Sequence, residues 1–351
     1  MLYLAGLIYS KNIDYGLKDV ETKLSLLIFP LIYFSSEKPN KPQLQSILNA
    51  FIKGCLASAI ICFSYALYQY ISTKYTISQG KWAWNYGINF FLKDRLSIWI
   101  HPSYRAMYFV LALAIIYFQR NKKGNVSFWQ KYFIPLILSF FVLLFNSKAG
   151  IITLSILGVM VCQQIVFKEK KIKLALTGML AAVLLFLSLY FAAPQFAIRI
   201  DEAVNSLTEN VDVKKSENST ASRMALWNAA KVVISENWMI GTGTGDVKDA
   251  LFKEYEKEGM SFALQENLNA HNQFLQTFAS LGIPGVLNIS LILLFPLLYS
   301  FKKRNYIYMV FLLMIIINFS VESMLETQAG VIFYAFFNFL LLFSFSQEEK
   351  I

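Results

Sequence analysis

The sequence predicts an all-α integral membrane protein, a multispanning helical bundle of about 8–10 spans with a large helical loop outside the membrane. Hydrophobic residues make up 56% of the 351 positions and charged residues 15%. Ordinary soluble domains contain about 45–50% apolar and about 25% charged residues. The apolar residues form long runs, and basic residues gather between these runs. We therefore treat residues 1–351 as a single polytopic membrane domain.

The apolar runs define the expected membrane segments, because a helix needs roughly 20 apolar residues to cross a bilayer. The first run opens at Met1 without the basic region of a signal peptide, so we interpret it as part of a longer helix and expect an N-terminal truncation or a late start codon. The expected segments are, in chain order, Met1–Tyr9, Leu24–Phe34, Ile47–Tyr70, Pro102–Phe118, Tyr132–Phe145, Ile151–Phe167, Leu174–Ala193, Phe274–Phe301, Tyr306–Val321 and Val331–Phe345.

Basic clusters between these segments, at 120–131, 168–173 and 302–304, predict the orientation. The positive-inside rule assigns the three loops to the cytoplasm. Residues 194–270 then form a large external loop, which contains eight Lys or Arg and twelve Asp or Glu. In this loop we expect one helix over 223–235, capped by Ser222, and another over 247–258. The formal net charge of +10 thus reflects membrane topology, and no nucleic-acid partner is expected.

His271 is one of two histidines and follows the external loop, where it opens an apolar helix together with Asn272. An imidazole, with an ordinary pKa near 6.5, is suited to abstract a proton from a hydroxyl group. The alternative is a histidine that merely lies at the membrane interface. The same helix is interrupted at 282–285 by Gly-Ile-Pro-Gly, and broken helices at membrane depth line a cavity or pack closely.

Three cations on the external side are candidates for phosphate binding, because Arg and Lys are the preferred partners of phosphate. Arg223 lies at an expected helix start, Lys148 between two spans and Arg105 one turn into a span. Solvation of Arg223 and snorkelling of Lys148 are the structural alternatives. Glu322 and Glu326, near the outer end of a span, are candidates for orienting a cation or an acceptor sugar, and Asn272 is a further candidate for orienting the acceptor.

The run Gly241-Thr242-Gly243-Thr244-Gly245 lacks the Gly-Lys-Ser/Thr ending of a phosphate-binding loop and follows no buried strand. It predicts a tight turn with glycines at positive φ, whose free N–H groups remain candidates for holding an anion. No cofactor and no metal ion is expected.

Several motifs together resemble the O-antigen ligase and polymerase superfamily, over the region 101–345. His271-Asn272 opening a helix before a Gly-x-x-Gly break is similar to the hallmark of that superfamily. Arg223 and Trp227 on one helix before the glycine run resemble its loop signature. Ser147-Lys148-Ala149-Gly150 stands where a Ser-Arg-Gly-like element is usual, and the closing segment 322–330 also resembles the family.

The resemblance implies a metal-independent glycosyltransferase of GT-C-like architecture in the bacterial inner membrane, with its active face in the periplasm. The implied partners are an undecaprenyl-pyrophosphate-linked glycan, a lipid A-core acceptor and membrane lipids. By the same resemblance His271 is the base, and Arg223 binds the donor pyrophosphate. Lys148 replaces the usual Arg and loses its two-pronged hydrogen bonding, a loss for which Arg105 is the candidate substitute.

Three other functions stay open from the sequence. An O-antigen polymerase or a protein O-oligosaccharyltransferase shares the donor and differs in the acceptor. A transporter or flippase for lipid-linked sugars predicts ionisable residues around a midplane cavity, whereas the candidates here gather at the outer interface. A non-catalytic scaffold predicts that His271 and Arg223 tolerate replacement.

Overall fold

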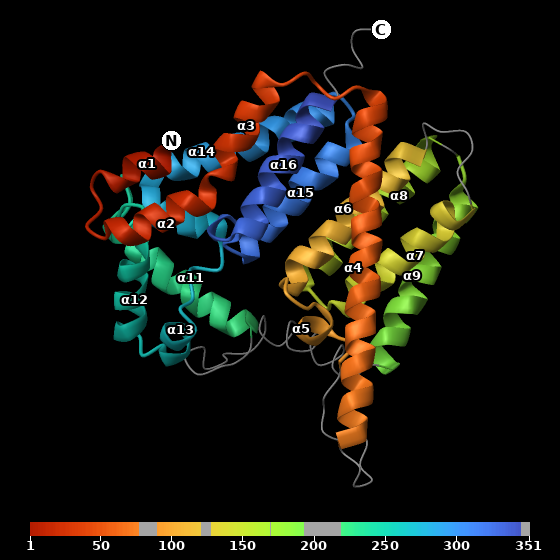
Figure 1. The fold of residues 1–351 in the computed structure, drawn as a ribbon, viewed down its shortest axis with the longest axis horizontal. Helices are drawn as coiled ribbons and strands as arrows, with labels where there is room; N and C mark the ends of the chain where they lie inside the picture. The colour runs from red at the N-terminus through yellow and green to blue at the C-terminus, as the bar shows by residue number, and fades with distance from the viewer. Residues whose placement is uncertain (77–89, 121–127, 169, 193–218, 345–351) are drawn as a thin grey trace. The chain divides into compact units, whose positions relative to one another are not determined.

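The computed structural model describes residues 1–76, 90–120, 128–168, 170–192 and 219–344, and all regular elements in these ranges are helices (Figure 1). Residues 193–218, the first part of the predicted external loop, lie outside the described residues, as do 121–127 in the first basic loop. The predicted all-α membrane fold is confirmed. Three helical stretches are long and apolar enough to cross a membrane, at Lys41–Thr73, Lys148–Phe167 and Gln273–Lys302. Shorter apolar helices include Ile134–Leu144, Tyr306–Val321 and Gln328–Leu342.

The contacts between residues group the chain into two compact units. One, called here the discontinuous unit, consists of Met1–Lys38 and Ala197–Ile351. The other, the central unit, consists of Pro39–Phe196. Whether the two form the single domain that the sequence predicts stays a prediction.

The central unit is built around α6 (Pro102–Arg120), whose residues from Ala106 to Ile115 are almost all buried. A Cβ on Gly150 would lie 2.6 Å from the Cβ of Ala106, so this glycine lets α8 (Lys148–Gln163) approach α6 closely. One π-helical turn, η2 (Trp129–Phe133), leads directly into α7 (Ile134–Leu144). Another, η3 (Gln164–Lys168), directly follows α8. The remaining elements of this unit are α4 (Lys41–Thr76), α5 (Lys93–Leu96) and α9 (Ile172–Ala192).

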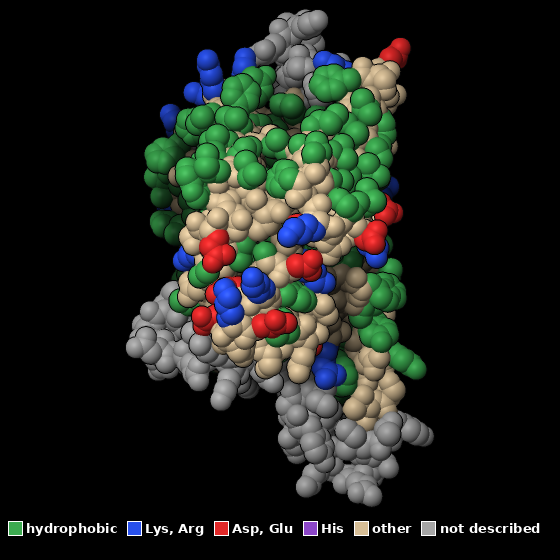
Figure 2. Space-filling view, turned by 90° about the vertical axis from the view of Figure 1, so that its left-hand side faces the viewer, with side chains coloured by type: hydrophobic (Ala, Val, Ile, Leu, Met, Phe, Trp, Pro, Cys, Tyr) green, Lys and Arg blue, Asp and Glu red, His purple; other side chains and the backbone are tan. Residues whose placement is uncertain are grey.

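In the discontinuous unit, α14 (Gln273–Lys302) and α15 (Tyr306–Val321) pack side by side, and α3 (Ser25–Ser35) packs on α16 (Gln328–Ser344). Two aromatic pairs lie in the contact between α3 and α16, Phe29 with Phe336 and Tyr33 with Phe339. The N-terminal run that was predicted to be part of a longer helix forms the short α1 (Leu2–Leu7). Figure 2 shows a band of hydrophobic side chains in the upper part of one face and a group of charged side chains beside it.

The described part of the external loop forms a small helical layer with its own core. It consists of α11 (Ser219–Glu236), α12 (Val247–Lys257) and α13 (Ser261–Gln265). Leu226, Ala230, Leu251 and Tyr255 are among the residues buried between these helices. The two helices predicted here are confirmed, but α11 begins three residues before Ser222. Ser222 therefore lies inside the helix and is not its N-cap, because the helical pattern continues through the small residues that precede it.

The predicted break in α14 is present at Gly282, whose φ of 59° and ψ of −153° are not helical. Pro284 has no N–H to bond the carbonyl of Ser280, so the N–H of Gly243 bonds it instead, at 2.9 Å. The N–H of Thr242 bonds the carbonyl of Ala279 at 2.9 Å. The glycine run is thus the predicted tight turn, and it completes the hydrogen bonding of the broken helix.

The anion-binding alternative for this turn is not supported, because its N–H groups are already bonded within the chain. Those of Gly241 and Gly245 bond the carbonyl of Asn237 at 2.8 Å and the hydroxyl of Ser10 at 2.9 Å. That of Thr244 bonds the carbonyl of Gly6 at 3.4 Å. Gly241 and Gly243 have φ values of 75° and 96°, which glycine adopts without the steric cost that other residues incur.

Candidate functional site

The carboxylate of Glu322, at the end of α15, contacts both leading candidate residues of the sequence. Its Oε2 lies 3.0 Å from Nδ1 of His271, and its Oε1 accepts a hydrogen bond from the guanidinium of Arg223. The Glu322 side chain is 9% exposed, whereas those of Arg223 and His271 are 21% and 28% exposed. A buried carboxylate therefore joins two groups that remain accessible from outside.

The backbone of His271 is held in an unusual conformation. Its φ is 44°, in the left-handed region that few residues other than glycine adopt. Its N–H donates to Oδ1 of Asn269 at 2.9 Å, and its carbonyl accepts from Nε1 of Trp227 at 3.3 Å. Trp227 follows Arg223 by one helical turn on α11, so this helix supplies both a cation and a support for the histidine. Such strained positions cluster at functional sites.

Asn272 fixes the start of α14 and its distance from the end of α15. Its Oδ1 caps the helix by accepting from the N–H of Leu275 at 3.1 Å, and its Nδ2 donates to the carbonyl of Ser320 at 2.9 Å. Its own N–H donates to the hydroxyl of Ser323 at 3.2 Å. These bonds support a positioning role for Asn272. That it orients an acceptor stays a prediction.

Two polar edges of the site are available to a ligand. In the described part of the chain, Nε2 of His271 has no hydrogen-bond partner, and Arg223 uses only one of its nitrogens, on Glu322. The guanidinium has five N–H donors in a planar fork. The arrangement can thus present an imidazole nitrogen to a hydroxyl group and several N–H donors to an anion.

Glu326 belongs to a different cluster from Glu322. Its Oε2 accepts from Nζ of Lys23 at 3.1 Å and its Oε1 from Nε2 of Gln273 at 3.3 Å. Lys23 also pairs with Asp19, one turn earlier on α2 (Ile13–Lys23). The cluster thus ties α2 to the turn η4 (Met324–Glu326), where Glu326 lies.

The pKa values in this cluster are shifted in opposite directions. Burial and the charge of Glu326 raise the pKa of Asp19 to about 8, against the opposing effect of Lys23. Burial alone raises the pKa of Glu326, but the Lys23 ammonium group and hydrogen bonds from its neighbours outweigh burial and hold this pKa below its usual value. The two shifts favour the protonated form of Asp19 and the ionised form of Glu326.

Arg105 and Lys148 both lie in the central unit, at the first turns of α6 and α8. Arg105 is 5% exposed, and its guanidinium donates to the hydroxyls of Ser97 and Ser58 and to the carbonyl of Ile98. These bonds give Arg105 a structural role. Lys148 is half-buried at the start of α8. For both residues, binding of the donor stays a prediction.

The sequence did not single out Asp19, Lys23 or Gln273. An Asp and a Lys spaced i,i+4 beside an apolar segment are the only sequence signal for the first two, and this spacing is usually a solvated pair. Gln273 follows Asn272 and gave no separate signal. Among the described residues, no group of three or more His, Cys, Asp or Glu side chains is arranged to hold a metal ion.

Comparison with known proteins indicates which family this chain is similar to. Residues 133–290 match the family described as O-Antigen ligase, a region that includes Lys148, Arg223 and His271. An uncharacterized protein of Haemophilus influenzae is 23% identical over 180 residues, which cover 48% of this chain and 45% of that protein. The matched region thus spans about half the length of this relative. The family match over residues 133–290 and the all-α membrane fold together support membership of the O-antigen ligase superfamily.

Proposed function

We propose that this chain is a glycosyltransferase of the O-antigen ligase type. It moves a glycan from undecaprenyl pyrophosphate to a hydroxyl group of lipid A-core, at the periplasmic face of the bacterial inner membrane. The contact of Glu322 with both His271 and Arg223 carries the proposal, together with the family match. It places a candidate base next to a candidate phosphate-binding cation.

The proposed reaction is a displacement at the anomeric carbon of the donor glycan. The acceptor oxygen forms a bond to this carbon while the bond between the carbon and the pyrophosphate oxygen breaks. The proton of the acceptor hydroxyl moves to Nε2 of His271, and undecaprenyl pyrophosphate leaves with the bonding electrons. Arg223 stabilises the negative charge that develops on the leaving group, and fixed charges of this kind supply a large part of enzymatic rate enhancement.

Glu322 gives His271 the tautomer that this reaction requires. A carboxylate accepts but does not donate, so the imidazole nitrogen that faces it carries the proton. Nε2 is then unprotonated and able to accept from the acceptor hydroxyl, over a distance of about 2.6–3.2 Å in a productive complex. When His271 has taken up the proton, Glu322 forms an ion pair with the imidazolium and stabilises it.

A reconstituted transfer assay tests the proposal. The purified protein, in lipid nanodiscs, receives undecaprenyl-pyrophosphate-linked glycan and lipid A-core without nucleotide, with and without EDTA. We expect glycan on the lipid core, unaffected by EDTA and lost in His271→Ala and Arg223→Ala. Lys231→Ala, which removes an exposed cation two turns after Arg223 on α11, is the matched control and should be fully active.

Each other outcome points to a different function. Chains that lengthen on the carrier instead of moving to the lipid core would make the protein a polymerase, and glycan on an added protein acceptor would make it a protein O-oligosaccharyltransferase. Folded protein that transfers nothing, but moves lipid-linked sugar across the bilayer, would be a transporter. If transfer survives in both alanine variants, His271 and Arg223 are not the reacting residues.

A further inference from the structure

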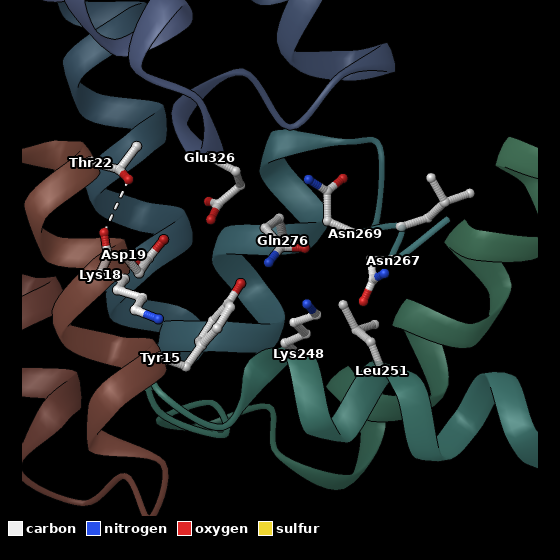
Figure 3. A pocket seen from close by; sticks show the side chains of 11 residues that line it. Tyr15, Lys18, Asp19, Thr22, Lys248, Leu251, Asn267, Asn269, Gln276 and Glu326 are labelled. Carbon is white, nitrogen blue, oxygen red and sulfur yellow. Dashed lines mark hydrogen bonds between the residues drawn. The ribbon is translucent and has the colours of Figure 1, made fainter. Parts of the chain in front are cut away.

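A small polar cavity lies beside the candidate site within the discontinuous unit (Figure 3). Its volume is about 190 Å³, below the roughly 300–1,000 Å³ of pockets that enclose drug-sized ligands. It therefore suits one small group. Its lining comes from α2, α12, the segment before His271, the start of α14 and η4, and consists of Tyr15, Lys18, Asp19, Thr22, Lys248, Leu251, Asn267, Leu268, Asn269, Gln276 and Glu326.

Gln276 presents a hydrogen-bond donor to this cavity. The residue is 2% exposed, and its Oε1 accepts from the N–H of Ala270 at 3.2 Å, which fixes the orientation of the amide. Its Nε2 then points toward Tyr15 and Lys248 (Figure 3). Within the described residues no group accepts a hydrogen bond from this nitrogen. This donor faces the cavity, so a hydroxyl oxygen of a ligand can take the place of the water that would otherwise accept from it.

The lining combines donors and acceptors without a strong excess of either charge. Lys18 and Lys248 bring two ammonium groups, Glu326 brings a carboxylate that also pairs with Lys23, and Asp19 brings a carboxyl group whose raised pKa favours its neutral form. A phosphate would meet the carboxylate of Glu326, and a metal cation would meet the two lysines. Hydroxyl groups both donate and accept, so a neutral polyhydroxylated ring matches such a lining. Tyr15 adds a hydroxyl group, which can donate and accept, and an aromatic ring whose centre lies 5.7 Å from the Lys248 ammonium (Figure 3).

We propose that this cavity binds a single sugar ring through its hydroxyl groups, with Gln276 Nε2 as one donor and Glu326 as one acceptor. Two lining residues connect the cavity to the candidate base, since Asn269 accepts from the N–H of His271 and Gln276 from that of Ala270. A sugar here thus contacts the residues that hold the His271 backbone. Its identity as a sugar of the transferred glycan or of the acceptor rests on the proposed function.

Ligand-observed NMR tests the cavity directly. The protein is placed in phospholipid nanodiscs, because detergents with maltoside head groups would compete. The probes are the methyl glycosides of glucose, galactose and N-acetylglucosamine, and saturation transfer to their ring protons is measured. We expect binding of at least one glycoside, with affinity reduced about 2- to 12-fold by the loss of one hydrogen bond in Gln276→Glu or Tyr15→Phe.

Gln276→Glu keeps an oxygen that can accept from Ala270, replaces the NH₂ donor with a second oxygen and adds a negative charge. Lys253→Met, on the exposed side of α12, is the matched control for Lys248→Met. We expect Lys248→Met to weaken binding and Lys253→Met to leave it unchanged. Absence of saturation transfer from every glycoside, equal transfer in all variants, or tight binding of inorganic phosphate in their place would overturn the inference.

The test separates this inference from the proposed function. His271→Ala should abolish transfer in the reconstituted assay and still bind the glycosides, because the imidazole is not part of the cavity lining. Glycoside binding without any transfer by the wild-type protein would leave the cavity assignment standing and remove the ligase function. Transfer without glycoside binding would support the ligase function and rule out the sugar site in the cavity.

Discussion

Replacing Glu322 by Gln is the most direct test of the candidate site. The change keeps the size of the side chain and removes its charge. The amide NH₂ can donate to Nδ1 of His271, which favours the tautomer that carries its proton on Nε2. The nitrogen that faces the acceptor hydroxyl is then no longer a base. Arg223 loses its ionic partner in the same step.

The expected losses of rate and of stability follow from the roles of the three residues and from their exposure. Loss of a general base costs about 10²–10⁴-fold in rate, and a carboxylate-to-amide change behind a catalytic imidazole costs up to about 10⁴-fold. We therefore expect kcat for glycan transfer to fall by about 10²–10⁴-fold, or roughly 3–5 kcal/mol. Arg223 and His271 are partly exposed, so the loss of their partner should change the free energy of unfolding by only about 1 kcal/mol.

The assay compares initial rates of transfer at saturating donor, with thermal unfolding of each variant measured in the same nanodiscs. Glu322→Asp retains the charge and should retain more activity than Glu322→Gln. Glu236→Gln, the same chemical change at the exposed end of α11, is the control. A kcat of Glu322→Gln within about threefold of the wild-type value would refute the role of Glu322, and so would an activity loss that only follows a loss of folded protein.

Three further outcomes are expected. Trp227→Phe removes the donor to the His271 carbonyl, so kcat should fall about tenfold or less, measured in the transfer assay with little change in unfolding temperature. Gly282→Ala places a Cβ 2.5 Å from backbone atoms of Met239 at a φ of 59°, which costs at least about 1–2 kcal/mol and should lower the unfolding temperature. Asp19, whose folded pKa is raised to about 8, binds a proton that the unfolded chain releases near pH 4. Its contribution to stability is therefore present below pH 4 and is lost between about pH 4 and 8, by at most about 1.4 kcal/mol per pH unit. Asp19→Asn has no group that titrates at this position, so its unfolding temperature should rise relative to that of the wild type from pH 5 to 8. Above pH 8 the difference between the two should stay constant. A difference that is constant over the whole pH range would contradict a raised pKa of Asp19.

The apolar helices of this protein could be predicted from the sequence because apolar runs and breaks are local signals, whereas the polar α2 was not predicted. The run 274–301 gives α14, and Gly282 and Pro284 announce its break. The start of α11 was misplaced, since Ser222 is a good cap by residue type but the preceding small residues are also compatible with a helix. Local sequence patterns predict the existence of a helix more reliably than they predict its first residue.

The pairing of the site residues could not be predicted in the same way. Glu322 lies 99 residues from Arg223 and 51 from His271, and Glu326 lies 303 residues from Lys23. Arg223, His271 and the two glutamates were identified by their chemistry, whereas Lys23 was not. Nothing local indicates which carboxylate reaches which cation. Glu322 and Glu326 are four residues apart and looked like one pair. They point to different partners because α15 ends at Val321 and the following turn changes direction.

The glycine run at 241–245 and the helix break at Gly282 act together to fix the geometry of the candidate site. The turn at 241–245 follows the end of α11, the helix that carries Arg223, and bonds the carbonyls that the break leaves free in α14, the helix that His271 precedes. The contact of Trp227 with the His271 carbonyl makes a second attachment, from the middle of α11 to the residue that precedes the start of α14. Two separated attachments fix both the distance and the angle between helices, whereas one would leave a hinge. The glycines therefore act on function by holding the cation and the base in a fixed relation, without contacting a phosphate, and their replacement should reduce transfer through the loss of this geometry.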